Sequence, residues 1–369
     1  GGALCGMRAS EESAGSFYKT QGDVYCVSDI HSDHTDNFEL VKAWPEHPED
    51  SLLVVGDISH KPEVIEKTLR VLTAKYKEVF FVPGNHELWV DREREPESDS
   101  IQKFEQVLAL CGKLGVRTSP ALVGDCWVVP LFSFYDRSLD LTCSSPELLT
   151  SHGGHDIVAN QDESEASTLG EWAQGFERWP WVDFARCVWP SVTKELASVE
   201  GEVEEGDETF RENQYPEGVS RYFCKLNQAS VDAVGEQLRS GVGSGVVTMS
   251  HFLPCRQTLP DWVIPSDKKL DMEWVGHGAA AVSVKFSRVA GSVLVDRQMR
   301  EVSEGTGVPH IHAFGHSHRP KNFMLNGVRY FHNPVGKKKE RDYKMLNPLP
   351  QPELLYSSKG PSPPPHRAA

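Results

Sequence analysis

Aspartate, histidine and asparagine recur in five short motifs of this 369-residue chain, and all three residue types bind metal ions. In chain order the motifs are Asp29-x-His31, Gly56-Asp57, Gly84-Asn85-His86-Glu87, Ser250-His251 and Gly315-His316-x-His318. Carboxylate, imidazole and amide oxygen donors together suit divalent ions such as Mn, Fe or Zn. No cysteine lies in any motif, which argues against a structural zinc cluster.

The number of donors exceeds what one ion needs. The candidate metal ligands are Asp29, His31, Asp57, Asn85, His251, His316 and His318. An aspartate such as Asp57 can bridge two ions about 3.5–4 Å apart, and such a pair holds both the attacking and the leaving oxygen of an in-line phosphoryl displacement. The donor set therefore predicts a two-metal centre for phosphoryl chemistry.

Each motif follows a short apolar run that reads as a buried β-strand. The runs end at Ser28, Val55, Pro83, Met249 and Phe314. Active sites of α/β sheets gather where strands end, so we expect the motifs to meet there. The glycines of the second, third and fifth motifs allow sharp turns where a Cβ would crowd a metal. The two-residue spacing in the first and fifth motifs predicts that both side chains point the same way from extended backbone.

The ordered set of motifs resembles the calcineurin-like metallophosphoesterase superfamily, over a core from Gly22 to Gly336. The resemblance implies an α/β fold, a four-layer αββα sandwich of two mixed sheets with an inserted cap-like region. By position, one metal would take Asp29, His31, Asp57 and His318, and the other Asp57, Asn85, His251 and His316. The implied reaction is dinuclear metal-dependent hydrolysis of a phosphomonoester or phosphodiester, with a bridging hydroxide as nucleophile and His86 assisting the leaving group.

The second motif departs from one branch of the superfamily. Serine/threonine phosphatases carry Gly-Asp-x-x-Asp-Arg-Gly there, whereas this chain continues from Asp57 as Ile-Ser-His-Lys-Pro and lacks the arginine that would grip a phosphoprotein. The resemblance thus implies the type of reaction but does not identify the substrate. Two alternatives stay open, a non-catalytic scaffold of the same fold and a nuclease. Asp29 and Asp57 could also be N-caps of helices expected over 37–43 and 62–76.

Charge and composition limit the classes of substrate, partner and compartment that we expect. A formal net charge of −15 disfavours tight binding to nucleic acid, so we expect a small phosphorylated substrate, while protein partners stay undetermined. The scattered cysteines, without a Cys-x-x-Cys pair, indicate a reducing compartment. No apolar run approaches the roughly 20 residues that span a bilayer. Cytoplasm is the default expectation, with an organelle left open because the chain does not begin with Met.

Composition shifts divide the chain. We expect a loose segment over 1–21, a phosphoesterase domain over 22–344 with an inserted cap-like region over 131–226, and a disordered Pro-rich tail over 345–369. Tryptophans between Trp172 and Trp189 could anchor a helix of the insertion or cover an apolar leaving group. Beyond the insertion, Val231, Val234 and Leu238 predict an amphipathic helix, and the segment Val282–Val295 predicts a strand.

Overall fold

The computed structural model describes residues 19–20, 22–141, 181–190, 217–260, 262–264, 269–270, 280–343 and 346–357. Its strands are β1 (Lys19–Thr20), β2 (Val24–Ser28), β3 (His47–Val55), β4 (Tyr76–Val82), β5 (Ala121–Val123), β6 (Cys126–Pro130), β7 (Gly245–Met249), β8 (Trp262–Ile264), β9 (Lys269–Leu270), β10 (His310–Ala313), β11 (Lys321–Leu325), β12 (Val328–His332) and β13 (Glu353–Tyr356). Its helices are α1 (Thr35–Ala43), α2 (Pro62–Lys75), α3 (Ser100–Leu114), α6 (Asp183–Arg186), α8 (Glu217–Arg239), α10 (Ala280–Ser287), α11 (Val293–Ser303) and α12 (Lys338–Asp342), with short 3-10 helices η1 (His86–Leu88) and η3 (Arg256–Thr258).

Two mixed sheets form the centre of the molecule. The larger has the strand order β1-β5-β6-β7-β10-β12-β11, and the smaller has the order β13-β2-β3-β4. The strands that lead into the motifs are parallel to their neighbours, β2 with β3 and β4 in the smaller sheet and β7 with β10 in the larger one. Their carboxyl ends therefore lie at one edge of each sheet.

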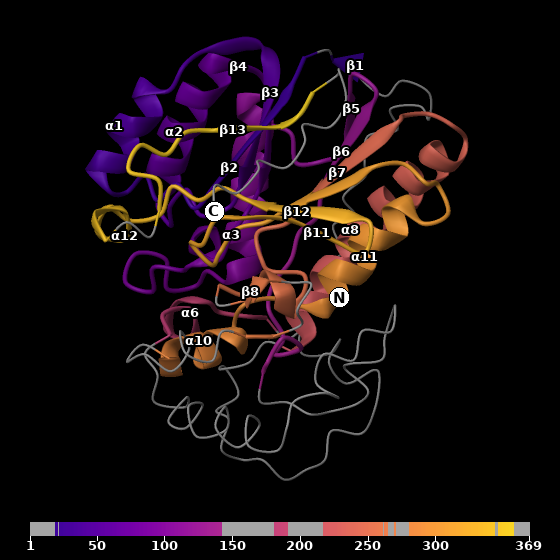
Figure 1. Ribbon diagram of the computed structural model, residues 1–369. Helices are drawn as coiled ribbons and strands as arrows, with labels where there is room; N and C mark the ends of the chain where they lie inside the picture. The colour runs from indigo at the N-terminus through magenta and orange to yellow at the C-terminus, as the bar shows by residue number, and fades with distance from the viewer. Residues whose placement is uncertain are drawn as a thin grey trace, which may run out of the picture.

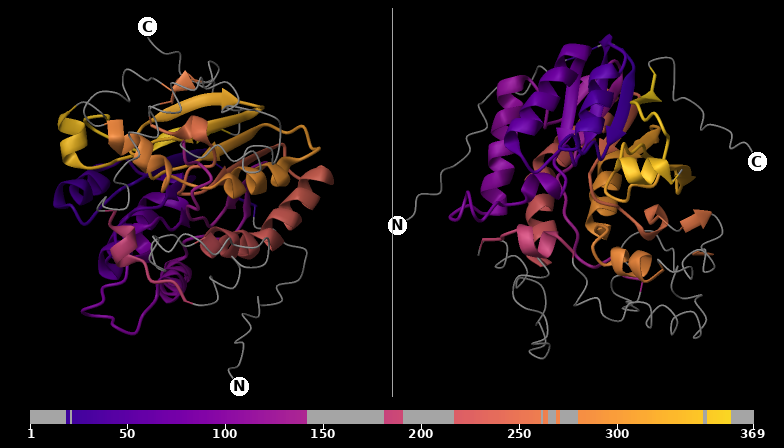
Figure 2. Two further views of the ribbon diagram at one scale, coloured as in Figure 1. Left: turned by 90° about the horizontal axis from the view of Figure 1, so that it is seen from below. Right: turned by 90° about the vertical axis from the view of Figure 1, so that its left-hand side faces the viewer.

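Helices cover the outer face of each sheet, as Figure 1 and the right-hand view of Figure 2 show. Apolar residues of α1, α2 and α3 pack on the smaller sheet, and those of α8 and α11 pack on the larger one. A third apolar cluster joins the two sheets face to face. The layers thus run helix, sheet, sheet, helix, and the expected αββα sandwich is confirmed.

Strand residues divide between these clusters with a period of two. In β2, Cys26 faces the other sheet and Val27 faces the helices, and in β4 Phe80 and Phe81 divide in the same way. Because both faces of each strand are covered, the sequence shows continuous apolar runs in place of alternation. The helices expected over 37–43 and 62–76 are present as α1 and α2.

The C-terminal segment differs from the disordered tail that its prolines predict. Residues 353–356 form β13, an antiparallel edge strand of the smaller sheet that pairs with β2. Leu355 is fully buried and Leu346 nearly so. Prolines flank this strand without interrupting it, because an edge strand needs ladder bonds on one side only. At the other end, residues 19–20 of the expected loose segment form β1 and pair with β5.

The strand predicted over Val282–Val295 is wrong. The chain forms α10 there, and then α11, which begins after Ser292 caps the backbone N–H of Leu294. Short apolar runs do not distinguish strand from helix by periodicity alone. The amphipathic helix predicted from Val231, Val234 and Leu238 is confirmed as part of α8.

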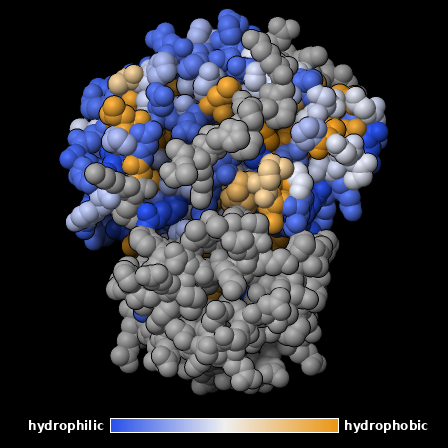
Figure 3. Space-filling model, viewed as in Figure 1, coloured by the Kyte–Doolittle hydropathy of each residue, from blue (hydrophilic) through white to orange (hydrophobic). Residues whose placement is uncertain are grey.

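The surface that Figure 3 shows is mostly hydrophilic over the coloured residues, with small separate apolar groups. Within the described ranges, no helix is both long and apolar enough to cross a membrane. Most of the predicted insertion, including Trp172, lies outside the described residues.

Candidate metal centre

All five motifs meet at the junction of the two sheets. Asp29, Asp57 and Asn85 follow the smaller sheet's β2, β3 and β4, while the histidines of the last two motifs follow β7 and β10 of the larger sheet. Hydrogen bonds join neighbouring loops, from the Asp29 N–H to the Gly56 carbonyl at 3.1 Å and from the Gly315 N–H to the His251 carbonyl at 2.9 Å. The expected convergence at strand ends is present.

Glycine is needed at the turns for steric reasons. A Cβ on Gly84 would collide with the Asp57 carboxylate, and one on Gly56 would collide with the His251 ring. On Gly315 a Cβ would lie 2.7 Å from the Val55 carbonyl oxygen. The crowding therefore comes from the donor side chains and from the close approach of the two sheets.

Left-handed backbone marks the residues that carry these donors. Five have positive φ: Asp29 (51°), His31 (46°), Asp57 (56°), His316 (71°) and His318 (51°). Among the described residues, Arg137 and Asn326 are the other non-glycine cases. Each such residue costs about 1–3 kcal/mol, and strain of this kind clusters at functional sites. The prediction that extended backbone aligns the paired side chains is wrong, since the chain turns sharply at each one, although the side chains still converge.

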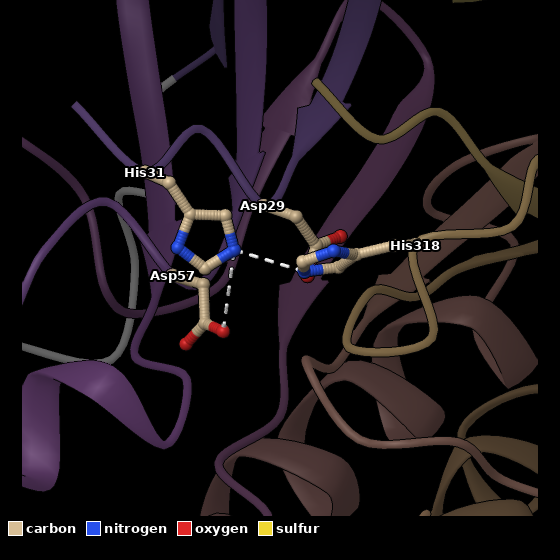
Figure 4. Close-up of side chains that lie close together, drawn as sticks. All are labelled: Asp29, His31, Asp57 and His318. Atoms are coloured by element: carbon tan, nitrogen blue, oxygen red, sulfur yellow. Dashed lines mark hydrogen bonds and ion pairs between the residues drawn. The ribbon is translucent and has the colours of Figure 1, made fainter. Parts of the chain in front are cut away.

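The first group of donors consists of Asp29, His31, Asp57 and His318. Figure 4 shows the four side chains pointing toward one another. Nε2 of His31 lies 2.9 Å from Nε2 of His318 and 4.0 Å from Oδ2 of Asp57. Oδ1 of Asp29 lies 3.6 Å from Nε2 of His318. One cation could contact all four donors.

The second group shares Asp57 with the first. Its other members are His251 and His316, and donor atoms of the three lie within 4.8 Å of one another. Nε2 of His251 lies 3.4 Å from Oδ1 of Asp57 and 3.3 Å from Oδ1 of Asn85. The structure thus brings the seven predicted ligands together in the two sets that the resemblance implied.

Hydrogen bonds at the far side of three of the four histidine rings show that these imidazoles suit a metal. His251 Nδ1 lies 3.0 Å from the Val55 carbonyl, His316 Nε2 lies 3.0 Å from the Val289 carbonyl, and His318 Nδ1 lies 3.0 Å from both Glu340 oxygens. These oxygens only accept, so a ring N–H points to them and the other nitrogen of each ring faces the centre, where a cation would take the place of any proton that this nitrogen carries. Metal-binding histidines are oriented in this way.

The two carboxylates are ionised. Burial opposes the charge of Asp29, but His332 at 3.0 Å and His318 lower the pKa of its carboxyl. Burial likewise opposes the charge of Asp57, and His251, through its charge and its hydrogen bond, holds the pKa of Asp57 well below the usual range. The two negative charges, beside ring nitrogens that face the same point, form a site that attracts cations. With oxygen and nitrogen donors and no sulfur, the residues fit a pair of divalent ions.

His86 lies beside this centre. Its Nε2 is 3.9 Å from Oδ2 of Asp57, and its ring stacks on Trp89 with centroids 3.8 Å apart. Burial lowers the pKa of His86 to about 4, so its imidazole is neutral at pH 7. A neutral imidazole can donate one N–H to an oxygen atom of a ligand.

A pocket of about 260 Å³ opens onto these residues. Its lining residues are Asp57, Asn85, His86, Trp89, Trp181, Val182, Asp183, Phe286, His316, Ser317, His318, Lys337 and Glu340. Three donors of the second group, Asp57, Asn85 and His316, line the pocket. The aromatic side chains of Trp89, Trp181 and Phe286 and the charged side chains of Lys337 and Glu340 also line it, so the pocket can receive a phosphate together with an apolar arm.

Four supporting residues were not assigned a role from the sequence. Glu87 accepts hydrogen bonds from four backbone N–H groups in the loops after β3 and β4, and His332 and Glu340 orient Asp29 and His318. Asp183 binds Asn85. The sequence could have indicated Glu87, because it belongs to the third motif. The other three supporting residues lie in no motif and are separated along the chain from the residues that they orient.

The alternative that Asp29 and Asp57 are helix N-caps is excluded. The N-cap residues of α1 and α2 are His34 and Lys61, and neither makes a side-chain capping bond. Both aspartates instead face the donor groups described above.

Comparisons with known proteins show which chains this one resembles. The curated acyl-carrier-protein phosphodiesterase PptH of Mycobacterium tuberculosis is 30% identical over 123 residues, which cover 31% of this chain and 38% of that relative. The match thus spans well under half of the relative's length. The crystal structure of the phosphopantetheinyl hydrolase PptH, from the same organism, superimposes with a TM-score of 0.56 at 18% identity, covering 93% of this chain and 99% of that one.

At that identity the structural likeness supports the fold alone. The family model described as calcineurin-like phosphoesterase matches residues 22–320, which include all five motifs. That range covers most of the chain and includes strands of both sheets. The chain therefore belongs to the calcineurin-like phosphoesterase family.

Proposed function

We propose that this protein is a dinuclear metal-dependent phosphodiesterase. The observation that carries the proposal is that Asp57 belongs to two groups of buried donors, one on each side of its carboxylate. The proposed ligands are Asp29, His31, Asp57 and His318 for one ion, and Asp57, Asn85, His251 and His316 for the other. Mn, Fe and Zn are the candidate ions, because each accepts mixed oxygen and nitrogen donors.

When bound, such a pair of ions activates water and neutralises phosphate charge. The protein's own residues do the rest. Asp57 holds the two donor groups together, and the rings of His251 and His316 are fixed by backbone carbonyls so that the site is preorganised. His86 lines the pocket and donates an N–H to the departing alcohol oxygen, which favours cleavage of the ester bond.

The substrate we propose is a phosphodiester with an apolar arm. The pocket beside the donors has a volume of about 260 Å³, and its aromatic lining residues suit an uncharged chain. The names of the relatives suggest a phosphodiester that joins a phosphopantetheinyl group to an acyl carrier protein. The sequence analysis led us to expect a small phosphorylated substrate, and we extend that expectation to a small phosphorylated group that is carried by a protein.

The two alternatives fit less well. A non-catalytic scaffold does not need strained backbone at five donor residues. In addition, this chain has all seven candidate ligands and the leaving-group residue His86. A nuclease needs basic surface to replace phosphate counterions, whereas the net charge is −15.

A substrate panel tests the proposal. The chelator-stripped full chain is reloaded with Mn²⁺ and assayed on p-nitrophenyl phosphate, bis-p-nitrophenyl phosphate, single-stranded and duplex DNA, and a phosphopantetheinylated acyl carrier protein. We expect Mn²⁺-dependent cleavage of the diester and of the carrier protein. Cleavage of DNA alone would favour the nuclease, and inactivity on every substrate would favour the scaffold.

A further inference from the structure

Asp183 is a buried carboxylate that no motif includes. It is 2% exposed and begins α6, in the region predicted as an insertion. Its Oδ1 accepts hydrogen bonds from Asn85 Nδ2 at 2.9 Å and Trp89 Nε1 at 2.7 Å, and its Oδ2 accepts one from Trp181 Nε1 at 2.9 Å. With both oxygens engaged by N–H groups, Asp183 is no metal ligand.

The hydrogen bond between Asp183 and Asn85 determines which way the side-chain amide of Asn85 faces. A carboxylate accepts hydrogen bonds and donates none, so only the NH₂ end of Asn85 can face Asp183. The carbonyl oxygen is thereby directed to the other side, where it lies 3.3 Å from Nε2 of His251. A rotated amide would direct two N–H donors at a cation, which would weaken binding there.

The two indole rings extend the influence of Asp183. Trp89 stacks on His86 with centroids 3.8 Å apart, and Trp181 meets His316 edge-on with centroids 5.8 Å apart. Each ring is fixed at its N–H by Asp183 and braces a histidine at its other side. One carboxylate thus contacts the Asn85 donor directly and reaches His86 and His316 through one aromatic ring each.

The segment that carries Asp183 is anchored to the loop after β4. The Val90 N–H donates to the Arg186 carbonyl at 2.9 Å, and the Ser100 N–H donates to the Val188 carbonyl at 2.7 Å. The Ser100 hydroxyl also accepts from the Val188 N–H at 2.9 Å. These bonds hold the carboxylate in a fixed position relative to Asn85, as orienting groups around a metal require.

We propose that Asp183 is the positioning residue of the second metal group. It selects the metal-facing rotamer of Asn85 and fixes the indoles that brace His86 and His316. The side-chain hydrogen bonds of Asp183 to described residues go to Asn85, Trp89 and Trp181, none of which belongs to the first group, so we expect the first group not to depend on it. This inference rests on the proposed two-metal function.

Mn²⁺ titration of the chelator-stripped full chain tests the proposal by calorimetry and electron paramagnetic resonance. We expect the wild type to bind two ions. In Asp183→Ala the dissociation constant of one ion rises about 10- to 100-fold, as for other groups that orient ligands, and that of the other is unchanged. The matched control is Asp140→Ala, because Asp140 is 1% exposed and forms ion pairs with Arg137 and Arg288, neither of which is a proposed metal ligand. It should leave both constants unchanged.

Each outcome has a definite meaning. If the wild type binds fewer than two ions, the proposed two-metal function fails. If the wild type binds two and Asp183→Ala binds both with unchanged affinity, or loses both equally, only the role of Asp183 is overturned. Should Asp183→Ala not fold, Asp183→Asn carries the test. Its single acceptor oxygen cannot serve three donors, so we expect about three- to tenfold weaker binding of one ion, and equal binding would overturn the role.

A double variant tests the route through Asn85. Asn85→Ala removes the donor that Asp183 orients, so adding Asp183→Ala should weaken the second ion by less than the product of the two separate effects. A loss equal to that product would mean that the two residues act independently, which would overturn the Asn85 route.

Discussion

Asp57 is the residue on which both metal groups depend. Its Oδ1 faces Nε2 of His251 at 3.4 Å, and its Oδ2 faces Nε2 of His31 at 4.0 Å. The backbone N–H of His86 also donates to Oδ1 at 3.1 Å, which fixes the carboxylate plane. A single side chain therefore connects the ligand groups and the proposed leaving-group residue.

Asp57→Asn should separate the two groups. An amide keeps the shape but loses the charge that holds two cations close together, so we expect metal content to fall from two ions to at most one and turnover to be lost. Elemental analysis after dialysis measures the metal content. Asp140→Asn is the matched buried control and should keep two ions. Full occupancy in Asp57→Asn would refute the bridging role.

His86→Ala should separate chemistry from metal binding. No metal group includes His86, so both ions should stay bound while turnover falls by about 10²–10⁴-fold. The loss should be larger for an alkyl than for a p-nitrophenyl leaving group, because a basic alkoxide needs the donated hydrogen bond more. Steady-state rates on a p-nitrophenyl diester and on an alkyl diester measure the two losses. An equal loss on both would show that His86 only positions the phosphate.

At the scale of elements, β13 shows how the C-terminal segment supports the sheet that carries Asp29. It pairs with β2, the strand that ends at the first motif, and Leu355 packs in the apolar cluster between the sheets. The side chain of Asn333 joins the same region, donating to the Cys26 carbonyl and the Gln351 carbonyl at 2.9 Å each.

Leu355→Ala should therefore destabilise the fold. Leu355 is 0% exposed, and leucine-to-alanine changes in a core cost about 2–5 kcal/mol. Urea unfolding of the metal-free protein measures the difference. Leu349→Ala is the control, since Leu349 is 72% exposed and should change stability by less than about 0.5 kcal/mol. Equal midpoints for the two variants would show that β13 does not contribute to the core.

We expect His310 in strand β10, which is not a proposed metal ligand, to make the stability of the fold depend on pH. His310 bonds to Thr248 and Ser303, both at 2.9 Å, and burial lowers its pKa to about 3. Between pH 6.5 and 3 the unfolded state therefore binds a proton that the folded state excludes, so stability falls as pH drops. His310→Gln should remove about 1.4 kcal/mol per pH unit from that slope. Unfolding at several pH values measures it, and parallel slopes would contradict it.

Across the whole molecule, the proposed ions connect the two sheets. Asp29, His31, Asp57 and Asn85 follow strands of the smaller sheet, and His251, His316 and His318 follow strands of the larger one. An ion bound to the native state alone stabilises it by about 2.7 kcal/mol at 100 times its dissociation constant. We thus expect Mn²⁺ to raise the melting temperature and a chelator to lower it, by scanning calorimetry. The shift should shrink in Asp57→Asn, and a shift of equal size there would argue against binding at this junction.

The metal donors were predictable because the information for them is local. A buried strand followed by a turn shows as an apolar run before a glycine or a polar residue, and the carboxyl ends of parallel strands meet in any sheet of this class. The types and order of the donors then indicated two ions. Asp29, Asp57 and His251 could be chosen on those grounds before any contact was known.

The orienting residues were decided only by the tertiary structure. Asp183 lies 98 positions from Asn85, and His332 lies 303 positions from Asp29, so no spacing relates them in the sequence. The left-handed turns at the donors and the pairing of β13 with β2 likewise depend on how the sheets pack. Periodicity reports which face of an element is buried, whereas hydrogen-bond partners are set by the pairing of distant segments, which a local pattern does not encode.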